Sequence, residues 1–248
     1  MGLAYGERTA VRAIDLAVPA RQFVAIVGES GSGKTTLLKI VNRLLEPDTG
    51  EVRIAGESTR AQPPHVLRRR IGYVFQRVGL FPHLTVAENI GVTPELLRWD
   101  HERITARVAE LLTLVDLPLE FGSRYPAELS GGQRQRVGVA RALAAEPSIL
   151  LMDEPFGALD PLTRDALGGE YRRLHERLGL TTLMVTHDVL EAVLLADRIV
   201  VLRAGSIVAD GTPRELMNDQ TDGAVRALME TPRRQALRVA SLLDDHAP

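Results

Sequence analysis

The feature that most constrains the fold of this chain is a short apolar run, residues 23–27, that leads directly into a glycine-rich turn at residues 28–35. No polar residue interrupts the run, and such runs are typical of β-strands that are covered on both faces. Beyond the turn, apolar residues recur on one face of a helix; they are Leu37, Leu38, Val41, Leu44 and Leu45. A buried strand, a tight turn and a helix in this order indicate an α/β fold.

Further strand-like and helix-like patterns alternate along the chain. Alternating apolar residues predict a half-buried strand at residues 14–18. Short apolar stretches predict further strands at residues 52–54, 71–75, 149–152 and 183–185, and a hairpin of residues 199–202 and 206–209 that turns at Ala204-Gly205. This alternation predicts a mostly parallel sheet, and in such sheets ligands bind at the carboxyl ends of the strands.

One long stretch of the chain lacks the strand pattern. Between about residue 88 and residue 147 we expect a helical insert. It contains a clear helical stripe, for which Asp100 is the expected N-cap; the stripe consists of Ile104, Val108, Leu111, Leu112 and Val115. A second stripe predicts a helix after the insert, and its members are Leu167, Tyr171, Leu174 and Leu178. We assign residues 1–211 to one domain and residues 212–248 to a polar, helical tail that is exposed to solvent.

The composition excludes several classes of function. With 30 basic and 32 acidic residues the net charge is −2, so the chain has no basic excess that would indicate nucleic-acid binding. It has no cysteine, which excludes disulfides, thiolate nucleophiles and cysteine-ligated zinc. The longest stretches without a charged residue are about ten residues, whereas a membrane-spanning helix needs about 20. Because no charged leader precedes an apolar core at the N-terminus, we expect a cytoplasmic protein.

The glycine-rich turn matches the phosphate-binding pattern G-x-x-x-x-G-K-[ST]. Its residues are Gly28-Glu29-Ser30-Gly31-Ser32-Gly33-Lys34-Thr35. The glycines let the backbone curl, so that successive N–H groups point inward and form a nest for phosphate oxygens. The helix that begins near Lys34 adds its positive end, Lys34 can reach the outer phosphates, and Thr35 offers a hydroxyl to Mg²⁺. The alternative is an ordinary Gly/Ser loop, but a position between a buried strand and a helix favours phosphate binding.

Two acidic residues, Asp153 and Glu154, follow the strand predicted at residues 149–152. A carboxylate at the tip of a buried strand, next to a phosphate loop, is well placed to hold Mg²⁺ through water. A second carboxylate directly after it can accept a proton from an attacking water. The alternative is a pair of surface acids in a turn before Pro155. The phosphate loop in the same chain favours a magnesium and base site.

A further motif carries a family resemblance. The signature LSGGQ of the ATP-binding subunits of ABC transporters is reproduced by Leu129-Ser130-Gly131-Gly132-Gln133. Taken alone, this stretch is equally typical of a serine-capped helix start with flexible glycines. The order of the motifs along the chain favours the family signature, because the phosphate loop precedes this stretch and the acid pair follows about 20 residues later. The resemblance extends over nearly the whole chain. It implies a P-loop NTPase core of the RecA-like type with a mostly parallel sheet, a small antiparallel β part and the helical insert of that family.

The resemblance also implies ATP and Mg²⁺ as cofactors, a nucleotide-binding domain at residues 1–211, and a role for individual residues. Glu154 would activate the attacking water, and His187 would hold the γ-phosphate and this water. Gln76 would sense Mg²⁺ and link the site to a membrane partner. The implied magnesium site comprises Thr35, Gln76 and Asp153. The implied nucleotide-binding residues are Tyr5, Gly28, Ser30, Gly31, Ser32, Gly33, Lys34, Thr35, Thr36, Ser130, Gly131, Gly132, Gln133 and Asp160.

Tyr5 lies 23 residues before Gly28, where the family places an aromatic residue that stacks on adenine. Stacking of a base on an aromatic ring contributes about 1–3 kcal/mol. The alternative for Tyr5 is a frayed terminus. Members of the family usually have another strand before this residue, but only residues 1–4 precede Tyr5. We therefore expect either a truncated start or an antiparallel edge that is one strand short.

The family pattern implies partners as well. The signature loop of one subunit caps the γ-phosphate bound by the phosphate loop of another, and Asp160 shapes this contact. Hydrolysis therefore needs two copies of the domain, as a head-to-tail homodimer or as a pair with a close paralogue. The resemblance further implies permease subunits, an indirect link to a periplasmic or lipid-anchored solute-binding protein, no nucleic acid, and a peripheral position at the cytoplasmic face of the inner membrane.

Several stretches resemble one group of transporters, the importers of quaternary ammonium osmoprotectants such as glycine betaine, choline and proline betaine; they are residues 71–76, 79–90, 94–99 and 136–145. We therefore expect the ATPase subunit of such a bacterial importer. The alternatives are an importer of another small solute, an exporter, and a soluble ABC ATPase of DNA repair or the ribosome. Many members of the group carry a C-terminal domain that responds to ionic strength, for which the residues from Thr212 are too few. The groove for the permease is expected at Phe81, Pro82, Leu84 and Trp99.

Overall fold

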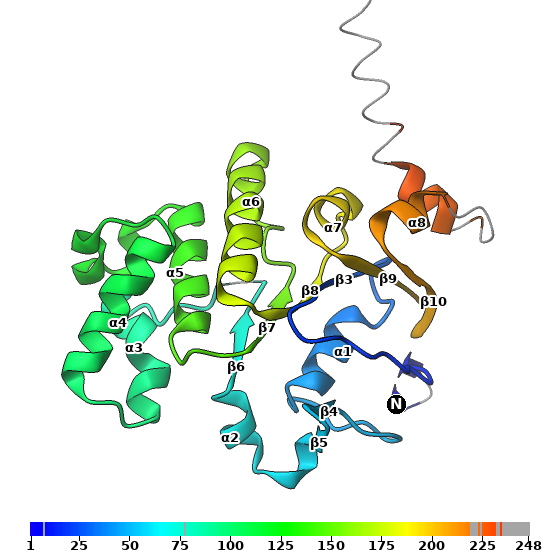
Figure 1. Cartoon of the computed structure of the whole chain (residues 1–248), viewed down its shortest axis with the longest axis horizontal. Helices are drawn as coiled ribbons and strands as arrows, with labels where there is room; N and C mark the ends of the chain where they lie inside the picture. Colours follow the sequence, from blue (N-terminus) through cyan, green and yellow to red (C-terminus); the bar gives the residue numbers. More distant parts are fainter. Residues whose placement is uncertain (7, 77, 219–222, 224, 232–233, 235–248) are drawn as a thin grey trace, which may run out of the picture.

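The computed structural model describes residues 1–6, 8–76, 78–218, 223, 225–231 and 234. Its centre is a six-stranded sheet in the order β10-β9-β3-β8-β7-β6 (Figure 1). The strands are β3 (Phe23–Val27), β6 (Ile71–Val74), β7 (Ile149–Asp153), β8 (Thr181–Val185), β9 (Arg198–Arg203) and β10 (Ser206–Gly211). The neighbouring strands are parallel except for β10, which forms the predicted antiparallel hairpin with β9. The prediction of an α/β fold with a mostly parallel sheet is confirmed.

Alternate residues of the central strands face two separate hydrophobic cores. In β3, Phe23, Ala25 and Val27 belong to one core, whereas Val24 and Ile26 belong to the other. All five residues are buried. Burial on both faces explains why this strand reads as an unbroken apolar run in the sequence.

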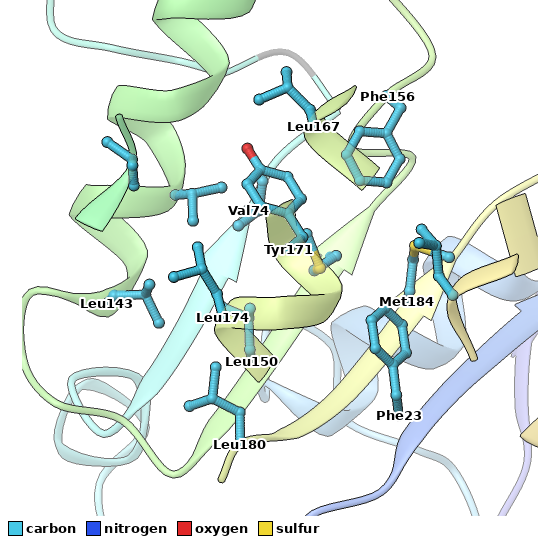
Figure 2. Packing of buried hydrophobic residues seen from close by; sticks show 14 of the residues in the cluster. Phe23, Val74, Leu143, Leu150, Phe156, Leu167, Tyr171, Leu174, Leu180 and Met184 are labelled. Atoms are coloured by element: carbon cyan, nitrogen blue, oxygen red, sulfur yellow. The ribbon is translucent and has the colours of Figure 1, made fainter. Parts of the chain in front are cut away.

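The first core lies between the sheet and three helices, α5 (Gly131–Leu143), α6 (Pro161–Leu178) and α7 (Val189–Leu195). Figure 2 shows Tyr171 and Leu174 of α6 packed among side chains of the strands, including Val74 and Leu150. The rings of Tyr171 and Phe156 stack with centroids 5.2 Å apart. Because Phe156 follows the acid pair in sequence, this contact anchors the turn that leads away from β7.

The second core lies between the sheet and α1 (Lys34–Val41), with α2 (Pro64–Arg68) and the short 3-10 helix η1 (Thr59–Ala61) nearby. Two small antiparallel sheets complete this side of the molecule. They are formed by β1 (Leu3–Tyr5) with β2 (Arg8–Val11), and by β4 (Arg53–Ile54) with β5 (Glu57–Ser58). The small antiparallel β part expected from the sequence is therefore present.

Two predictions near this core were wrong. Residues 14–18, all of which the structure describes, form no strand: Ile14 exchanges backbone hydrogen bonds with Met1, and the Ala17 carbonyl accepts one from the Arg198 side chain. The helix predicted from the apolar stripe is shorter than expected. It ends at Val41, and Arg43 has a φ of 48°, so the chain turns away before the last two leucines of the stripe.

The helical insert lies between β6 and β7, where the described residues form helices and no strand, as predicted. Its helices are α3 (Val86–Leu96), α4 (His101–Leu114) and α5, joined by the 3-10 helices η2 (Leu119–Ser123) and η3 (Pro126–Glu128). Asp100 caps α4, because its Oδ1 accepts a hydrogen bond of 2.8 Å from the Arg103 N–H. In Figure 1 the insert, coloured green, lies beyond the β6 edge of the sheet.

The described part of the tail does not behave as the sequence predicts. After β10, helix α8 (Pro213–Asn218) buries Leu216, and Val225 and Met229 join the same core. A wholly solvated tail was therefore a wrong prediction, because a few apolar side chains suffice to dock a mostly polar segment. Residues 219–222, 224, 232–233 and 235–248 lie outside the described residues, and the domain boundary after residue 211 stays a prediction. None of the described helices has the length and hydrophobicity that a membrane span requires.

Candidate functional site

The glycine-rich turn connects β3 to α1 at the carboxyl edge of the central sheet. Gly28 has a φ of 153°, and a Cβ at this position would lie 2.1 Å from the carbonyl oxygen of Leu202. Gly33 has a φ of 102°, and a Cβ there would lie 2.2 Å from the carbonyl oxygen of Ala10. Both positions need a residue without a side chain. The turn is therefore held closely between the end of β9 and strand β2.

The interior of the turn is lined by hydrogen-bond donors. Lys34 is buried, and its Nζ donates to the carbonyl oxygens of Gly28, at 2.8 Å, and of Glu29, at 2.9 Å. Burial lowers the pKa of Lys34, and nearby carboxylates oppose this shift. The hydroxyl of Ser32 is buried and has no hydrogen-bond partner among the described residues. A cation and an unsatisfied hydroxyl in a glycine turn at a helix N-terminus match what a bound phosphate group requires.

Asp153, the last residue of β7, is only 7% exposed. The Thr35 hydroxyl donates to its Oδ1 at 2.9 Å, and Tyr73 is also hydrogen-bonded to this carboxylate. Burial raises the pKa of Asp153, and the bonds from Thr35 and Tyr73 oppose this rise. Burial raises the pKa of Tyr73 as well, so this phenol stays a donor. Carboxylate and hydroxyl oxygens are the ligands that Mg²⁺ prefers, so Thr35 and Asp153 are suited to hold it.

Glu154 follows Asp153 directly, but its carboxylate meets different partners. Its Oε2 accepts a hydrogen bond of 2.9 Å from Nε2 of Gln76, and Nδ1 of His187 lies 3.3 Å from the same oxygen. Gln76 comes after β6 and His187 after β8, which are the two neighbours of β7 in the sheet. The structure therefore brings together residues that the sequence presents as three separate motifs.

The signature residues begin α5. The Ser130 hydroxyl accepts from the Gln133 N–H at 3.3 Å, and Oε1 of Gln133 accepts from the Ser130 N–H at 2.8 Å, which makes a capping box. A Cβ on Gly132 would lie 2.8 Å from Cγ2 of Thr163, at the start of α6. Asp160 caps that helix by accepting from the Thr163 N–H at 3.0 Å. The signature thus lies beside the turn that carries Asp160. The phosphate loop instead begins α1, which packs on the opposite face of the sheet from α6 (Figure 1).

Tyr5 is the last residue of β1, where it pairs with Arg8, and its side chain is 52% exposed. The hairpin of β1 and β2 contacts the phosphate loop, because the carbonyl of Ala10 lies against Gly33. An exposed ring on a hairpin beside the loop is compatible with an adenine platform, and that role stays a prediction. The remaining expected residues of the loop region lie where the sequence places them, in the turn and in the first turn of α1: Ser30, Gly31 and Thr36.

Comparison with known proteins decides the family. A family model described as "ABC transporter" matches residues 11–157, which is more than half of the chain. The chain belongs to the ABC transporter family. It is 54% identical over 214 residues to the glycine betaine/carnitine/choline transport ATP-binding protein OpuCA of Bacillus subtilis (strain 168). The aligned residues cover 86% of this chain and 56% of OpuCA. It is 50% identical over 222 residues to the glycine betaine uptake system ATP-binding protein YehX of Escherichia coli (strain K12). The aligned residues cover 90% of this chain and 72% of YehX. The chain thus spans little more than half the length of OpuCA.

Solved structures agree with this family. The dimeric structure of MJ0796, a bacterial ABC transporter cassette, has a TM-score of 0.76 and 37% identity, and the match covers 85% of this chain and 95% of that one. A structure of the same ATP-binding cassette in a post-hydrolysis state, bound to ADP and Pi, has a TM-score of 0.75 and 36% identity, with coverage of 85% and 94%. The fold is that of an ABC cassette, a P-loop NTPase fold, as the resemblance implied.

Two residues of this ABC cassette that sequence reasoning missed hold the segment after Gln76. Asn89 in α3 is fully buried, and its side chain makes four hydrogen bonds to backbone groups of residues 81–85. Arg141 in α5 donates to the two carbonyls of residues 78–79 at 2.6 and 2.8 Å. The sequence analysis includes both residues only within the stretches 79–90 and 136–145 that carry the family resemblance, and their contacts to residues 78–85 had no sequence signal.

Proposed function

We propose that this chain is the ATP-binding and ATP-hydrolysing subunit of a bacterial ABC importer. The observation that carries the proposal is the geometry at the carboxyl edge of one sheet. There Thr35, the residue after Lys34, donates to Asp153, and His187 lies beside Glu154. Donors for phosphate, oxygen ligands for a metal ion and a general base are the parts that phosphoryl transfer to water requires. The names of the relatives, which are transport ATP-binding proteins, support this function.

In the proposed site, the glycine turn and Lys34 bind the β- and γ-phosphates through N–H donors and charge. Thr35, Asp153 and Gln76 are the residues that would hold Mg²⁺, with Asp153 acting through water. When bound, Mg²⁺ neutralises charge on the phosphate oxygens. Ser32 would supply the buried hydroxyl that lacks a partner among the described residues.

The proposed chemical step uses the second carboxylate. Glu154 accepts a proton from the attacking water, since a carboxylate at hydrogen-bond distance from water can act as a general base. His187 is held near Oε2 of Glu154 and would orient the γ-phosphate and this water. Gln76 shares the same carboxylate oxygen, so a change at Gln76 reaches the base directly. This link is how a membrane partner would be coupled to hydrolysis.

We further propose that the working unit is a dimer, either of this chain or with a close paralogue. The signature lies beside Asp160 in its own chain, so Ser130 and the two glycines after it are available to cap a nucleotide bound by a second copy. The N–H groups in the first turn of a helix are donors without a partner in that helix, and they suit phosphate oxygens. The dimeric structure of the similar cassette MJ0796 supports this arrangement.

The partner in the membrane is proposed to be a permease, reached from the cytoplasmic face of the inner membrane, with a solute-binding protein acting indirectly. Phe81 is 42% exposed and lies within the segment held by Asn89 and Arg141, so it can form part of the docking groove. Quaternary ammonium osmoprotectants are the proposed solutes, because both relatives named above transport or take up glycine betaine. A different small solute would leave the ATPase chemistry unchanged, since that chemistry does not contact the solute.

A mixing experiment tests the composite site. Lys34→Ala removes the phosphate cation, and Ser130→Arg blocks the signature, so each variant alone is expected to hydrolyse no ATP. In a 1:1 mixture, half of the dimers contain one intact site, and hydrolysis should return to about a quarter of the wild-type rate. The control is a mixture of two preparations of Lys34→Ala, which should stay inactive. Chelation of Mg²⁺ should abolish the activity in every case.

The outcomes separate the parts of the proposal. A wild-type chain that hydrolyses no ATP, alone or with its permease, contradicts the function. Active wild type with no recovery in the mixture contradicts the composite site. The solute is tested separately, by asking whether glycine betaine, choline or sulfate increases ATP hydrolysis by the complete transporter in vesicles.

A further inference from the structure

A cluster of charged side chains lies where α6 packs beside α7, outside the group of residues that contact Glu154. Arg164 projects from the first turns of α6, and Asp188 and Glu191 belong to the start of α7. The side chains are 31%, 27% and 9% exposed, in that order, so the cluster is largely covered. None of the steps proposed above uses these residues.

Arg164 contacts three acceptors from different parts of the chain. Its Nη1 donates to Oδ2 of Asp188 at 3.1 Å. Its Nε lies 3.7 Å from Oε1 of Glu191, which is an ion-pair distance, and has no hydrogen-bond partner among the described residues. Its Nη2 donates to the carbonyl oxygen of Leu159 at 3.3 Å. A planar guanidinium presents several donors in a fixed arrangement, so one side chain can hydrogen-bond Asp188 and Leu159 while its charge lies beside Glu191.

Two of these acceptors belong to the network that holds the loop of His187. The Thr186 hydroxyl donates to Oε2 of Glu191 at 2.7 Å and accepts from the Asp188 N–H at 3.0 Å. Oδ1 of Asp188 accepts from the N–H groups of Leu190 and Glu191, at 2.9 and 3.3 Å, and thereby caps α7. The residues on both sides of His187 are therefore anchored, and Arg164 contacts both anchoring carboxylates.

The third acceptor belongs to the turn that carries Asp160. Leu159 directly precedes Asp160, and the backbone N–H of Arg164 donates to the Asp160 carbonyl at 2.9 Å. The side chain and the backbone of Arg164 thus both hold this turn. Through one residue, the turn beside the signature and the loop of His187 are joined into a single unit.

We infer that Arg164 is a positioning residue for the hydrolysis of ATP, which rests on the function proposed above. It fixes the loop of His187 relative to the turn of Asp160. The imidazole of His187, beside Glu154, is thereby placed correctly relative to a nucleotide that is clamped across the dimer. Misplacement of a catalytic group by about 1 Å can lower the rate about 100-fold, although no contact to the substrate is lost.

The test compares Arg164→Gln, Arg164→Lys and the control Arg173→Gln in the full chain. Arg173 lies on the same helix, is exposed, and forms no hydrogen bond or ion pair that involves the described residues. We expect Arg164→Gln to lower kcat for ATP between about tenfold and about 100-fold, with KM changed less than about threefold. Arg164→Lys should recover part of this loss, because an ammonium group keeps the charge beside Asp188 and Glu191 but lacks the planar array of donors that also reaches the Leu159 carbonyl. Arg173→Gln should match wild type.

A second measurement reports on His187 without ATP hydrolysis. The imidazole signals of ¹⁵N-labelled protein, assigned through a His187→Ala variant, should shift or broaden in Arg164→Gln and stay unchanged in Arg173→Gln. Unchanged His187 signals, or a kcat that falls only in proportion to the folded fraction at the assay temperature, would overturn the inference. If wild type itself hydrolyses no ATP, the proposed function fails, and the imidazole signals still decide whether Arg164 positions His187.

Discussion

Asp153→Asn is expected to stabilise the chain while it destroys the proposed magnesium site. Asp153 is only 7% exposed, and burial raises its pKa because a charged carboxylate is costly to place away from water. Asparagine has nearly the same shape and no charge. The hydroxyls of Thr35 and Tyr73 can each donate or accept, so they can satisfy the new amide where they satisfied the carboxylate.

The sign of the effect and its pH dependence follow from linkage. Because the pKa of Asp153 is higher in the folded state than in the unfolded state, wild type loses stability as the pH rises from the ordinary carboxyl pKa through the raised value. Each unit of the shift costs about 1.4 kcal/mol above both values. At pH 8, where the wild-type carboxylate is charged in both states, the Asp153→Asn variant should therefore have a higher free energy of unfolding than wild type. The Tm of the variant at pH 8 should accordingly lie above that of wild type.

Urea unfolding and thermal scans without Mg²⁺ or nucleotide, at pH 8 and pH 5, measure this difference. The advantage of the variant should be largest at pH 8 and smaller at pH 5, and its ATP hydrolysis should be lost. Asp160→Asn is the matched control, because hydrogen bonds from the Thr163 side chain and backbone lower the pKa of that exposed carboxylate, so the substitution should not stabilise. If Asp153→Asn is less stable than wild type at pH 8, burial is not the dominant influence on this carboxylate and the reasoning is refuted.

Three further predictions concern the loops of the site. Glu154→Gln should lower kcat about 100- to 10,000-fold, the usual contribution of a general base, while a fluorescent ATP analogue still binds; full phosphate release would contradict the assigned role. Gly33→Ala places a Cβ 2.2 Å from a backbone oxygen of β2, so it should abolish the rise in Tm that ATP causes. Gly56 also has a positive φ, 82°, but open space around it, so the control Gly56→Ala should leave that rise intact. Asn89→Ala leaves buried backbone groups of residues 81–85 without partners and should cost about 2–3 kcal/mol in urea unfolding; an unchanged midpoint would show that water replaces the side chain.

Local sequence patterns were sufficient to predict the elements that are covered on both faces or bounded by glycine. Strand β3, the turn after it and the start of α1 follow from an apolar run and from positions where only glycine is tolerated. The hairpin of β9 and β10 turns at Ala204 and Gly205, which have φ values of 46° and 82°. In each case the information lies within a few residues, so the sequence alone is sufficient.

Predictions failed where a distant part of the chain decides the structure. The alternation at residues 14–18 is real, but an extended segment becomes a strand only when a neighbour supplies hydrogen bonds along its length. There the bonds come from Met1 and from the side chain of Arg198. In the same way, Leu216, Val225 and Met229 are sparse in a polar segment, and only the presence of an uncovered part of the core explains their burial. Composition describes a segment and does not show what it packs against.

The same limit applies to the candidate site. The sequence places Gln76, Glu154 and His187 after three strands, but their contact depends on the order β8-β7-β6 in the sheet, which is not the order along the chain. The family resemblance supplied a shared role for these residues, and the strand order became known only from the structure. Arg164 and Asn89 were missed because each acts on backbone or carboxylate groups that become neighbours only after folding.

Two adjacent carboxylates come to differ because the strand ends between them. Asp153 completes the ladder of β7, so its side chain points into the covered region under the phosphate loop, toward Thr35. Glu154 adopts a φ of 45°, which leaves the strand geometry, and its N–H still bonds to the Val185 carbonyl at 2.8 Å. If the strand continued, side-chain alternation would fix the direction of the second carboxylate. The left-handed backbone conformation of Glu154 instead turns this carboxylate toward the ends of β6 and β8. One carboxylate is thereby placed for a metal ion and the next for water, which is the division of labour that the proposed hydrolysis requires.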